Sequence, residues 1–249
     1  MLVTGTVIGV LSFLAAIVPL LALGLGMLFL GVMILFLPES ASLRDDRIAV
    51  LSSLPSIMNV EALLEDLDIN SRGIYLPTTG FTAVPKVLLP MTESTTILDS
   101  VNRLTSTNRV FVTTGLNPRD RGILLNPPGG EILVSLESAL RLDLSTIRTG
   151  ELETRLKLGF DMLGISKKTL VGVQGDIVTV EVTLAMMRQL EERLRATAPR
   201  VTEQIGTPLT SAIVSVISKA TGRNVRFGES TLSGSKMIVN TQISGVEPP

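Results

Sequence analysis

The sequence predicts an N-terminal transmembrane helical hairpin followed by an α+β domain, in which helices cover one face of a mixed sheet. Three observations lead to this fold class. Residues 1–38 contain no Asp, Glu, Lys or Arg, residues 69–150 are rich in short strand-like stretches, and residues 151–249 place two helices between two pairs of strands. Helices packed on one side of a sheet are a common layered arrangement of α+β domains.

The uncharged N-terminal run is too long for one membrane helix. A bilayer is spanned by roughly 20 apolar residues, whereas a continuous helix over 2–37 would be about 54 Å long. Pro19 and Gly24 interrupt the run near its middle, and both residue types favour chain reversal. We therefore expect two short spans, about 3–18 and 23–37, joined by a tight turn.

Two other interpretations of this run stay open. One is a single span over about 17–37, and the other is a cleaved signal peptide, which would need a basic start and a shorter apolar core. The first basic residue is Arg44, which disfavours the signal peptide. The predicted localisation is the cell membrane, with the domain on the cytoplasmic side. The charge bias beside the run is a weak guide to orientation, and the absence of an Asn-x-Ser/Thr glycosylation site is consistent with that side.

Small residues recur at helical spacing within the predicted spans. Such residues let membrane helices approach closely, so the expected partners of the hairpin are the lipid bilayer and other membrane helices or copies of the same chain. The predicted helix-packing residues are Gly5, Gly9, Ser12, Ala16, Gly24 and Gly31.

Residues 39–68 are predicted to form a juxtamembrane helical segment, with helices at 43–54 and 56–67 separated at Pro55. Apolar residues with a spacing of 3.6 support the second helix. In 69–150, stretches bounded by proline and glycine are typical of short strands. The strands predicted there are 73–76, 83–89, 109–113 and 122–125, and the helices are 95–104 and 132–142.

The C-terminal region, 151–249, has the clearest pattern. After a helix at 151–163, Gly175-Asp176 predicts a tight hairpin turn, and Gly222 predicts a helix end. The strands expected here are 169–174, 177–184, 225–228 and 236–243, and the enclosed helices are 186–198 and 204–220. The helix at 186–198 carries a set of charged residues on one side: Arg188, Glu191, Glu192, Arg193 and Arg195.

Part of this region resembles a domain of uncharacterised archaeal membrane-anchored proteins. The residues that carry the resemblance are Gly206-Thr207-Pro208-Leu209-Thr210-Ser211-Ala212 and Ala220-Thr221-Gly222-Arg223-Asn224-Val225. It covers about a third of the chain and implies no activity.

Composition excludes several classes of function. The 22 basic and 23 acidic residues are nearly balanced, whereas a nucleic-acid-binding surface shows a basic excess. The chain has no His and no Cys, which removes thiolate and imidazole zinc sites and Ser-His-Asp or Cys-His catalysis. The sequence therefore predicts no catalytic, metal or cofactor residues.

One loop is a candidate for ligand contact. Residues 127–131 read Pro-Pro-Gly-Gly-Glu, and a glycine-rich turn can expose backbone N–H groups to an anion. The candidate contact residues are Gly129 and Gly130, with Arg119 and Arg121 from the preceding loop. Turns of this composition are also common without any ligand.

The expected function is that of a non-enzymatic, membrane-anchored interaction or accessory protein with a soluble protein partner, and in one version a subunit of a larger membrane complex. Two alternatives remain: a tethered sensory or ligand-binding module, and a carboxylate-based enzyme, whose site would leave no local sequence pattern.

Overall fold

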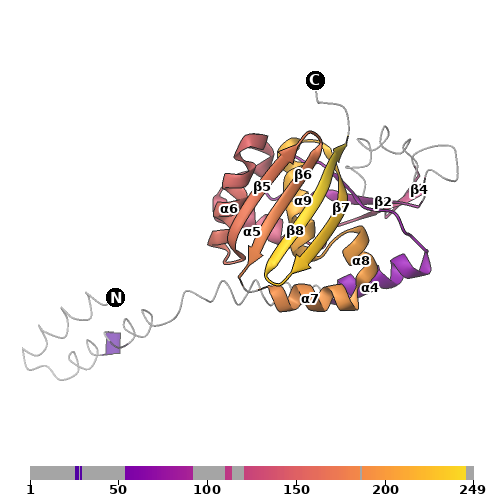
Figure 1. The fold of residues 1–249 in the computed structure, drawn as a ribbon, viewed down its shortest axis with the longest axis horizontal. Helices are drawn as coiled ribbons and strands as arrows, with labels where there is room; N and C mark the ends of the chain where they lie inside the picture. Colours follow the sequence, from indigo (N-terminus) through magenta and orange to yellow (C-terminus); the bar gives the residue numbers. More distant parts are fainter. Residues whose placement is uncertain are drawn as a thin grey trace, which may run out of the picture. The chain divides into compact units, whose positions relative to one another are not determined.

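The computed structural model describes residues 54–91, 110–113, 121–185 and 187–244, together with Gly26, Met27 and Phe29. The contacts within the chain divide it into two units, Met1–Ile48 and Ala49–Pro249. The elements described below all belong to the second unit, which contains every labelled helix and strand of Figure 1.

The described strands form one eight-stranded sheet, and neighbouring strands are antiparallel in each of its pairings. In sheet order they are β3 (Phe111–Thr113), β4 (Arg121–Leu125), β2 (Lys86–Pro90), β1 (Ile74–Leu76), β7 (Asn224–Ser233), β8 (Lys236–Ser244), β6 (Ile177–Leu184) and β5 (Ser166–Gln174). The predicted mixed sheet is therefore wrong. Strands from both sides of residue 150 join in this sheet, because β1 pairs with β7.

The helices share a large hydrophobic core with one face of this sheet. They are α4 (Leu54–Asp66), α5 (Gly130–Leu140), α6 (Leu152–Met162), α7 (Arg188–Thr197), α8 (Pro199–Gln204) and α9 (Pro208–Thr221), with short 3₁₀ turns η2 (Leu144–Thr146) and η3 (Thr149–Glu151). The opposite face of the first strands carries a separate cluster: Ile74, Leu76, Leu88, Val112 and Leu124.

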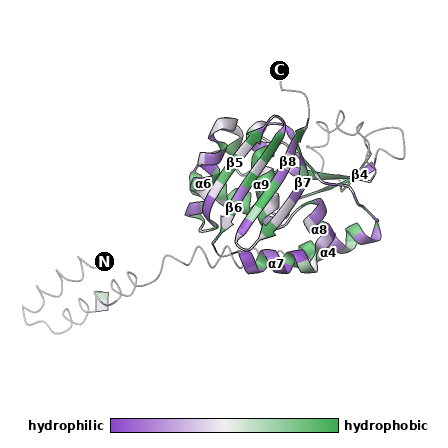
Figure 2. Ribbon diagram, viewed as in Figure 1, coloured by the Kyte–Doolittle hydropathy of each residue, from purple (hydrophilic) through white to green (hydrophobic). Residues whose placement is uncertain are grey.

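Helix α9 is the centre of this core. It lies behind strands β6 and β8 in the view of Figure 1, and Figure 2 shows the hydropathy of the same elements. Its residues from Pro208 to Ala220 are all buried, as expected of a helix packed on several sides. Thr207 caps its first turn through its side chain, and Gly222 ends it in the left-handed conformation (φ 64°).

The predicted transmembrane hairpin and the membrane localisation with a cytoplasmic domain are corrected. Among the described residues, no helix has both the length and the apolar character needed to cross a bilayer. The described residues of the second unit form an antiparallel α+β domain. The predicted spans at 3–18 and 23–37 lie outside the described residues, apart from Gly26, Met27 and Phe29.

Candidate functional site

The glycine-rich loop predicted for ligand contact is used for packing. Gly129 and Gly130 are both buried. A Cβ atom on Gly129 would lie 2.1 Å from the Pro208 carbonyl oxygen and 2.2 Å from the Ala212 backbone nitrogen, so this glycine allows the start of α5 to touch the backbone of α9. Arg121 begins β4 and is exposed. No hydrogen bond among the described residues joins it to either glycine.

The other predicted site residues cannot be placed. Arg119 lies outside the described residues. So do the six helix-packing residues of the predicted hairpin: Gly5, Gly9, Ser12, Ala16, Gly24 and Gly31.

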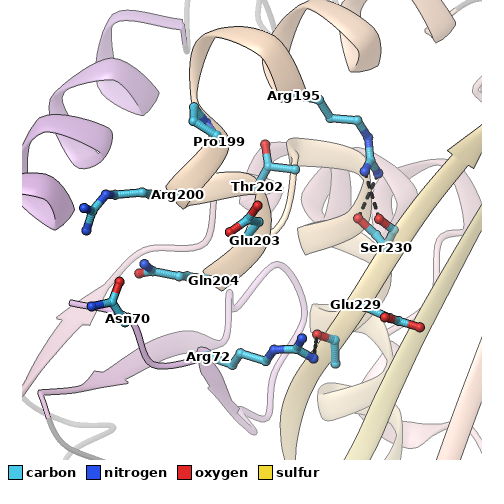
Figure 3. A pocket seen from close by; sticks show the side chains of 11 residues that line it. Asn70, Arg72, Arg195, Pro199, Arg200, Thr202, Glu203, Gln204, Glu229 and Ser230 are labelled. Carbon is cyan, nitrogen blue, oxygen red and sulfur yellow. Dashed lines mark hydrogen bonds between the residues drawn. The ribbon is translucent and has the colours of Figure 1, made fainter. Parts of the chain in front are cut away.

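The candidate site is a polar cleft of about 770 Å³ beside β7. We call it the arginine cleft. It is lined by Asn70, Arg72, Arg195, Pro199, Arg200, Thr202, Glu203, Gln204, Gly228, Glu229 and Ser230. These residues come from the segment before β1, from α7 and α8, and from β7 (Figure 3).

The floor of the arginine cleft is a bulge in β7. The register of β7 against β8 shifts between Phe227 and Glu229, and such bulges bend a strand and redirect its side chains. Gly228 occupies the bulge, where a Cβ atom would lie 2.6 Å from the Asn240 carbonyl oxygen. A larger residue would therefore push β7 away from β8 at this point.

Helix α8 is fixed between α4 and the segment before β1. The Glu61 carboxylate of α4 accepts hydrogen bonds from the backbone N–H groups of Arg200 (3.0 Å) and Val201 (2.8 Å). It thereby satisfies donors at the start of α8, where a negative charge is favoured. At the other end, the Gln204 carbonyl accepts from Gly73 N–H (2.7 Å), and the Gln204 side chain donates to the Ile69 carbonyl. These bonds hold the walls of the cleft together.

Two arginines of the cleft have only uncharged hydrogen-bond partners. Arg195 donates to the carbonyl and to the hydroxyl of Ser230, each at 2.8 Å, and Arg72 donates to the Gly228 carbonyl. Figure 3 shows the two side chains reaching β7 from different elements. Among the described residues, neither guanidinium forms an ion pair with a carboxylate.

The cleft has three further charged residues, Arg200, Glu203 and Glu229. Arg200 lies 3.7 Å from the carboxylate of Asp68, which is highly exposed. Glu203 and Glu229 are exposed at the rim. The arrangement thus combines two guanidinium groups that form no ion pair among the described residues with two exposed carboxylates, Glu203 and Glu229.

Glu191 lies one turn before Arg195 on α7 and is fully buried. Neither of its carboxyl oxygens makes a hydrogen bond in the described part of the chain. Burial raises the pKa of Glu191 to about 7, although the Thr207 hydroxyl, the Arg195 charge and the Leu209 backbone N–H act in the opposite direction. Sequence reasoning placed Glu191 with the charged side of this helix, but its side chain shares the buried face with Leu194.

Replacing Glu191 by glutamine is expected to remove a pH dependence of stability. The pKa of Glu191 in the folded chain, about 7, exceeds its ordinary 4.5, so the folded state binds this proton more tightly than the unfolded state. The resulting stabilisation is full below about pH 4.5 and is lost as the pH rises to about 7, by an amount on the order of 3 kcal/mol.

Urea unfolding of the parent chain and of the Glu191→Gln variant at about pH 5 and about pH 8 measures this effect. Between the lower and the higher pH, the free energy of unfolding should fall less in the variant than in the parent. Equal losses would contradict the assignment of the proton to Glu191. Asp143 does not interfere, because hydrogen bonds from Ser145 and the charge of Lys219 outweigh its partial desolvation and lower its pKa.

A second charged cluster is enclosed in the core. The Lys219 ammonium of α9 lies 2.7 Å from the Glu137 carboxylate of α5, and both side chains have no exposed surface. Lys219 also donates to the carbonyls of Gly80 (2.7 Å) and Ala83 (2.9 Å). Because its three donors are used within the fold, we assign this cluster a structural role.

In the described part of the chain, no three His, Cys, Asp or Glu side chains gather to hold a metal ion. The predicted absence of a metal or cofactor stays a prediction.

Comparison with known proteins gives one match. The model of a domain of unknown function, DUF7982, matches residues 2–233. No curated protein and no solved structure matches the chain. The predicted resemblance to an archaeal domain stays a prediction.

Proposed function

The chain belongs to the DUF7982 family of domains of unknown function, and we propose that it is a non-enzymatic binding module. In this proposal, the arginine cleft binds an acidic segment of a partner protein. The observation that carries this proposal is the pair Arg72 and Arg195, whose guanidinium groups are held on β7 by neutral acceptors. Guanidinium groups form strong, directional hydrogen bonds with carboxylates.

The character of the cleft favours a protein segment over a small molecule. Of its lining residues, all but Pro199 and Gly228 carry polar side chains, whereas small-molecule pockets are mostly apolar. The acidic rim formed by Glu203 and Glu229 would repel a dense polyanion such as nucleic acid, but it tolerates a peptide that also carries donor groups.

The non-enzymatic part of the proposal rests on the ionisable groups at the cleft. Glu191 has the strongly raised pKa that often marks a catalytic acid or base, but its side chain is fully buried and does not line the cleft. It therefore lacks contact with a bound ligand.

Binding of a labelled acidic peptide to the full chain tests this function. We expect a fluorescein-labelled peptide of alternating aspartate and serine to bind, as measured by fluorescence anisotropy, and its lysine counterpart not to bind. The variants Arg195→Gln and Arg72→Gln should each weaken binding about tenfold, because each loses a charge-assisted hydrogen bond. The affinity should also fall as salt is added.

The variant Arg188→Gln is the matched control. It removes the same charge from the same helix as Arg195→Gln, but Arg188 is exposed, is paired with Glu192 (2.8 Å) and does not line the cleft. Circular dichroism verifies that each variant is folded. Equal losses in Arg188→Gln and Arg195→Gln, or no binding of the acidic peptide at low salt, would refute the proposed function.

A further inference from the structure

The buried carboxyl of Glu191 and the cleft residue Arg195 are neighbours on α7, separated by one helical turn. Both Glu191 oxygens are buried without a hydrogen bond, and so is the Nε–H group of Arg195. The two terminal nitrogens of Arg195 bond to Ser230 in the arginine cleft. Arg195 therefore lies one helical turn from a buried acidic group and also lines the cleft.

Arg195 is the charged residue that acts on the pKa of Glu191. Helix α9 contributes two uncharged groups, the Thr207 hydroxyl and the Leu209 N–H. The charged residues of α8 and β7 are Arg200, Glu203, Arg226 and Glu229. All but Arg226 line the cleft. The other charged residues of α7 are exposed: Arg188, Glu192 and Arg193.

We propose that Glu191 sets the affinity of the arginine cleft for acidic ligands through the charge of Arg195. When Glu191 is ionised, its negative charge offsets the guanidinium and weakens the attraction for an incoming carboxylate. When Glu191 is protonated, the full charge of Arg195 acts on the ligand. This inference rests on the proposed function, because it concerns the regulation of the same cleft.

The expected pH window is unusually free of other titrating groups. Burial raises the pKa of Glu191 to about 7, and the chain contains no histidine and no cysteine. The side chain that usually titrates near neutral pH is therefore missing. An aspartate-containing peptide stays ionised above about pH 5, since its carboxyls titrate near pH 4. A change in affinity between about pH 5.5 and 8.5 thus reports on Glu191 or on a terminal amine.

Anisotropy titrations of the full chain with the aspartate–serine peptide at about pH 5.5 and 8.5 test the inference. We expect binding about tenfold tighter at the lower pH, the size of effect that one charge at short range produces near a protein surface. The Glu191→Gln variant, which is neutral at both values, should bind with the same tight affinity at each. The Arg188→Gln control should keep the pH dependence of the parent.

Proton uptake provides a second measurement that needs no variant. Because linkage is reciprocal, a carboxylate bound at Arg195 should favour the protonated form of Glu191. Calorimetric titrations of the parent chain near pH 7, in buffers of different ionisation enthalpy, should show uptake of a fraction of a proton.

The possible outcomes separate the two proposals. Binding that is equal at both pH values and accompanied by no proton uptake would refute the role of Glu191 while leaving the cleft as the binding site. A pH dependence that persists in Glu191→Gln would refute it as well. Absence of peptide binding at both pH values would refute the proposed function itself.

Discussion

Replacing Lys219 by methionine is expected to lower the free energy of unfolding by about 3–5 kcal/mol, the usual cost of removing one partner from a buried ion pair. Methionine has a similar length but no charge, so the Glu137 carboxylate would stay buried without its counter-ion. The carbonyls of Gly80 and Ala83 would also lose their hydrogen bonds from the lysine. Chemical denaturation followed by circular dichroism measures the change.

The effect is expected to be large because Glu137 joins several segments. Its carboxylate accepts hydrogen bonds from the backbone N–H groups of Thr82 (2.7 Å) and Leu144 (2.8 Å), besides its ion pair with Lys219. Loss of the lysine would therefore loosen the segment before β2 and the turn η2 as well as the contact between α5 and α9.

Two control variants make this prediction specific. Arg155→Ala breaks the exposed pair between Arg155 and Glu151 (3.1 Å) and should change stability by less than about 1 kcal/mol. The double variant Lys219→Met with Glu137→Gln should recover part of the loss, because no isolated charge stays buried. A loss in Lys219→Met no greater than that in Arg155→Ala would contradict the structural role of this cluster.

Local patterns predicted the hairpin of β5 and β6 well, whereas they predicted only residues 225–228 of β7, which extends from Asn224 to Ser233. The strands expected at 169–174 and 177–184 correspond to β5 and β6, and the predicted turn residue Gly175 has a φ of 61°. A two-residue turn requires this left-handed conformation, which glycine adopts without strain. These predictions are confirmed, because turn chemistry and alternation are encoded within a few neighbouring residues.

The start of α9 shows how a local rule can be misjudged. The sequence pattern predicted a helix from residue 204, whereas α9 begins at Pro208. Gly206 has a φ of 95°, which interrupts a helix, and Thr207 caps the new one with proline at its first position. Helix α8 ends at Gln204 for this reason. Gly206 and the capping Thr207 therefore mark the start of α9 more accurately than the apolar spacing does.

The strand order and the cleft depend on distant residues, which no local pattern specifies. Strand β1 pairs with β7, about 150 positions later, and this pairing places Arg72 in the same cleft as Arg195. Each arginine alone looks like a solvated surface residue. Glu191 was missed for a related reason, since helical spacing groups charged residues on one side without revealing which of them α9 will cover.

Replacing Gly129 by alanine is expected to destabilise the fold by about 3 kcal/mol or more, because overpacking against rigid backbone forces a displacement of whole elements. The new Cβ atom would lie 2.1 Å from the Pro208 carbonyl oxygen and 2.2 Å from the Ala212 nitrogen. Neither atom can rotate away as a side chain could, so α5 would have to separate from α9. Thermal and chemical unfolding of the variant measure the loss.

The matched control is Gly150→Ala, which adds the same methyl group at a position with no atom within 4 Å. Its φ is not positive, so alanine should be neutral or stabilising by up to about 1 kcal/mol. The comparison also decides between the two interpretations of the glycine-rich loop. If the loop served mainly to expose backbone N–H groups to an anion, Gly129→Ala would leave stability nearly unchanged. A loss confined to Gly129→Ala would instead establish that this glycine is required for the close contact of α5 with α9, and it would leave the arginine cleft as the site at which to look for ligands.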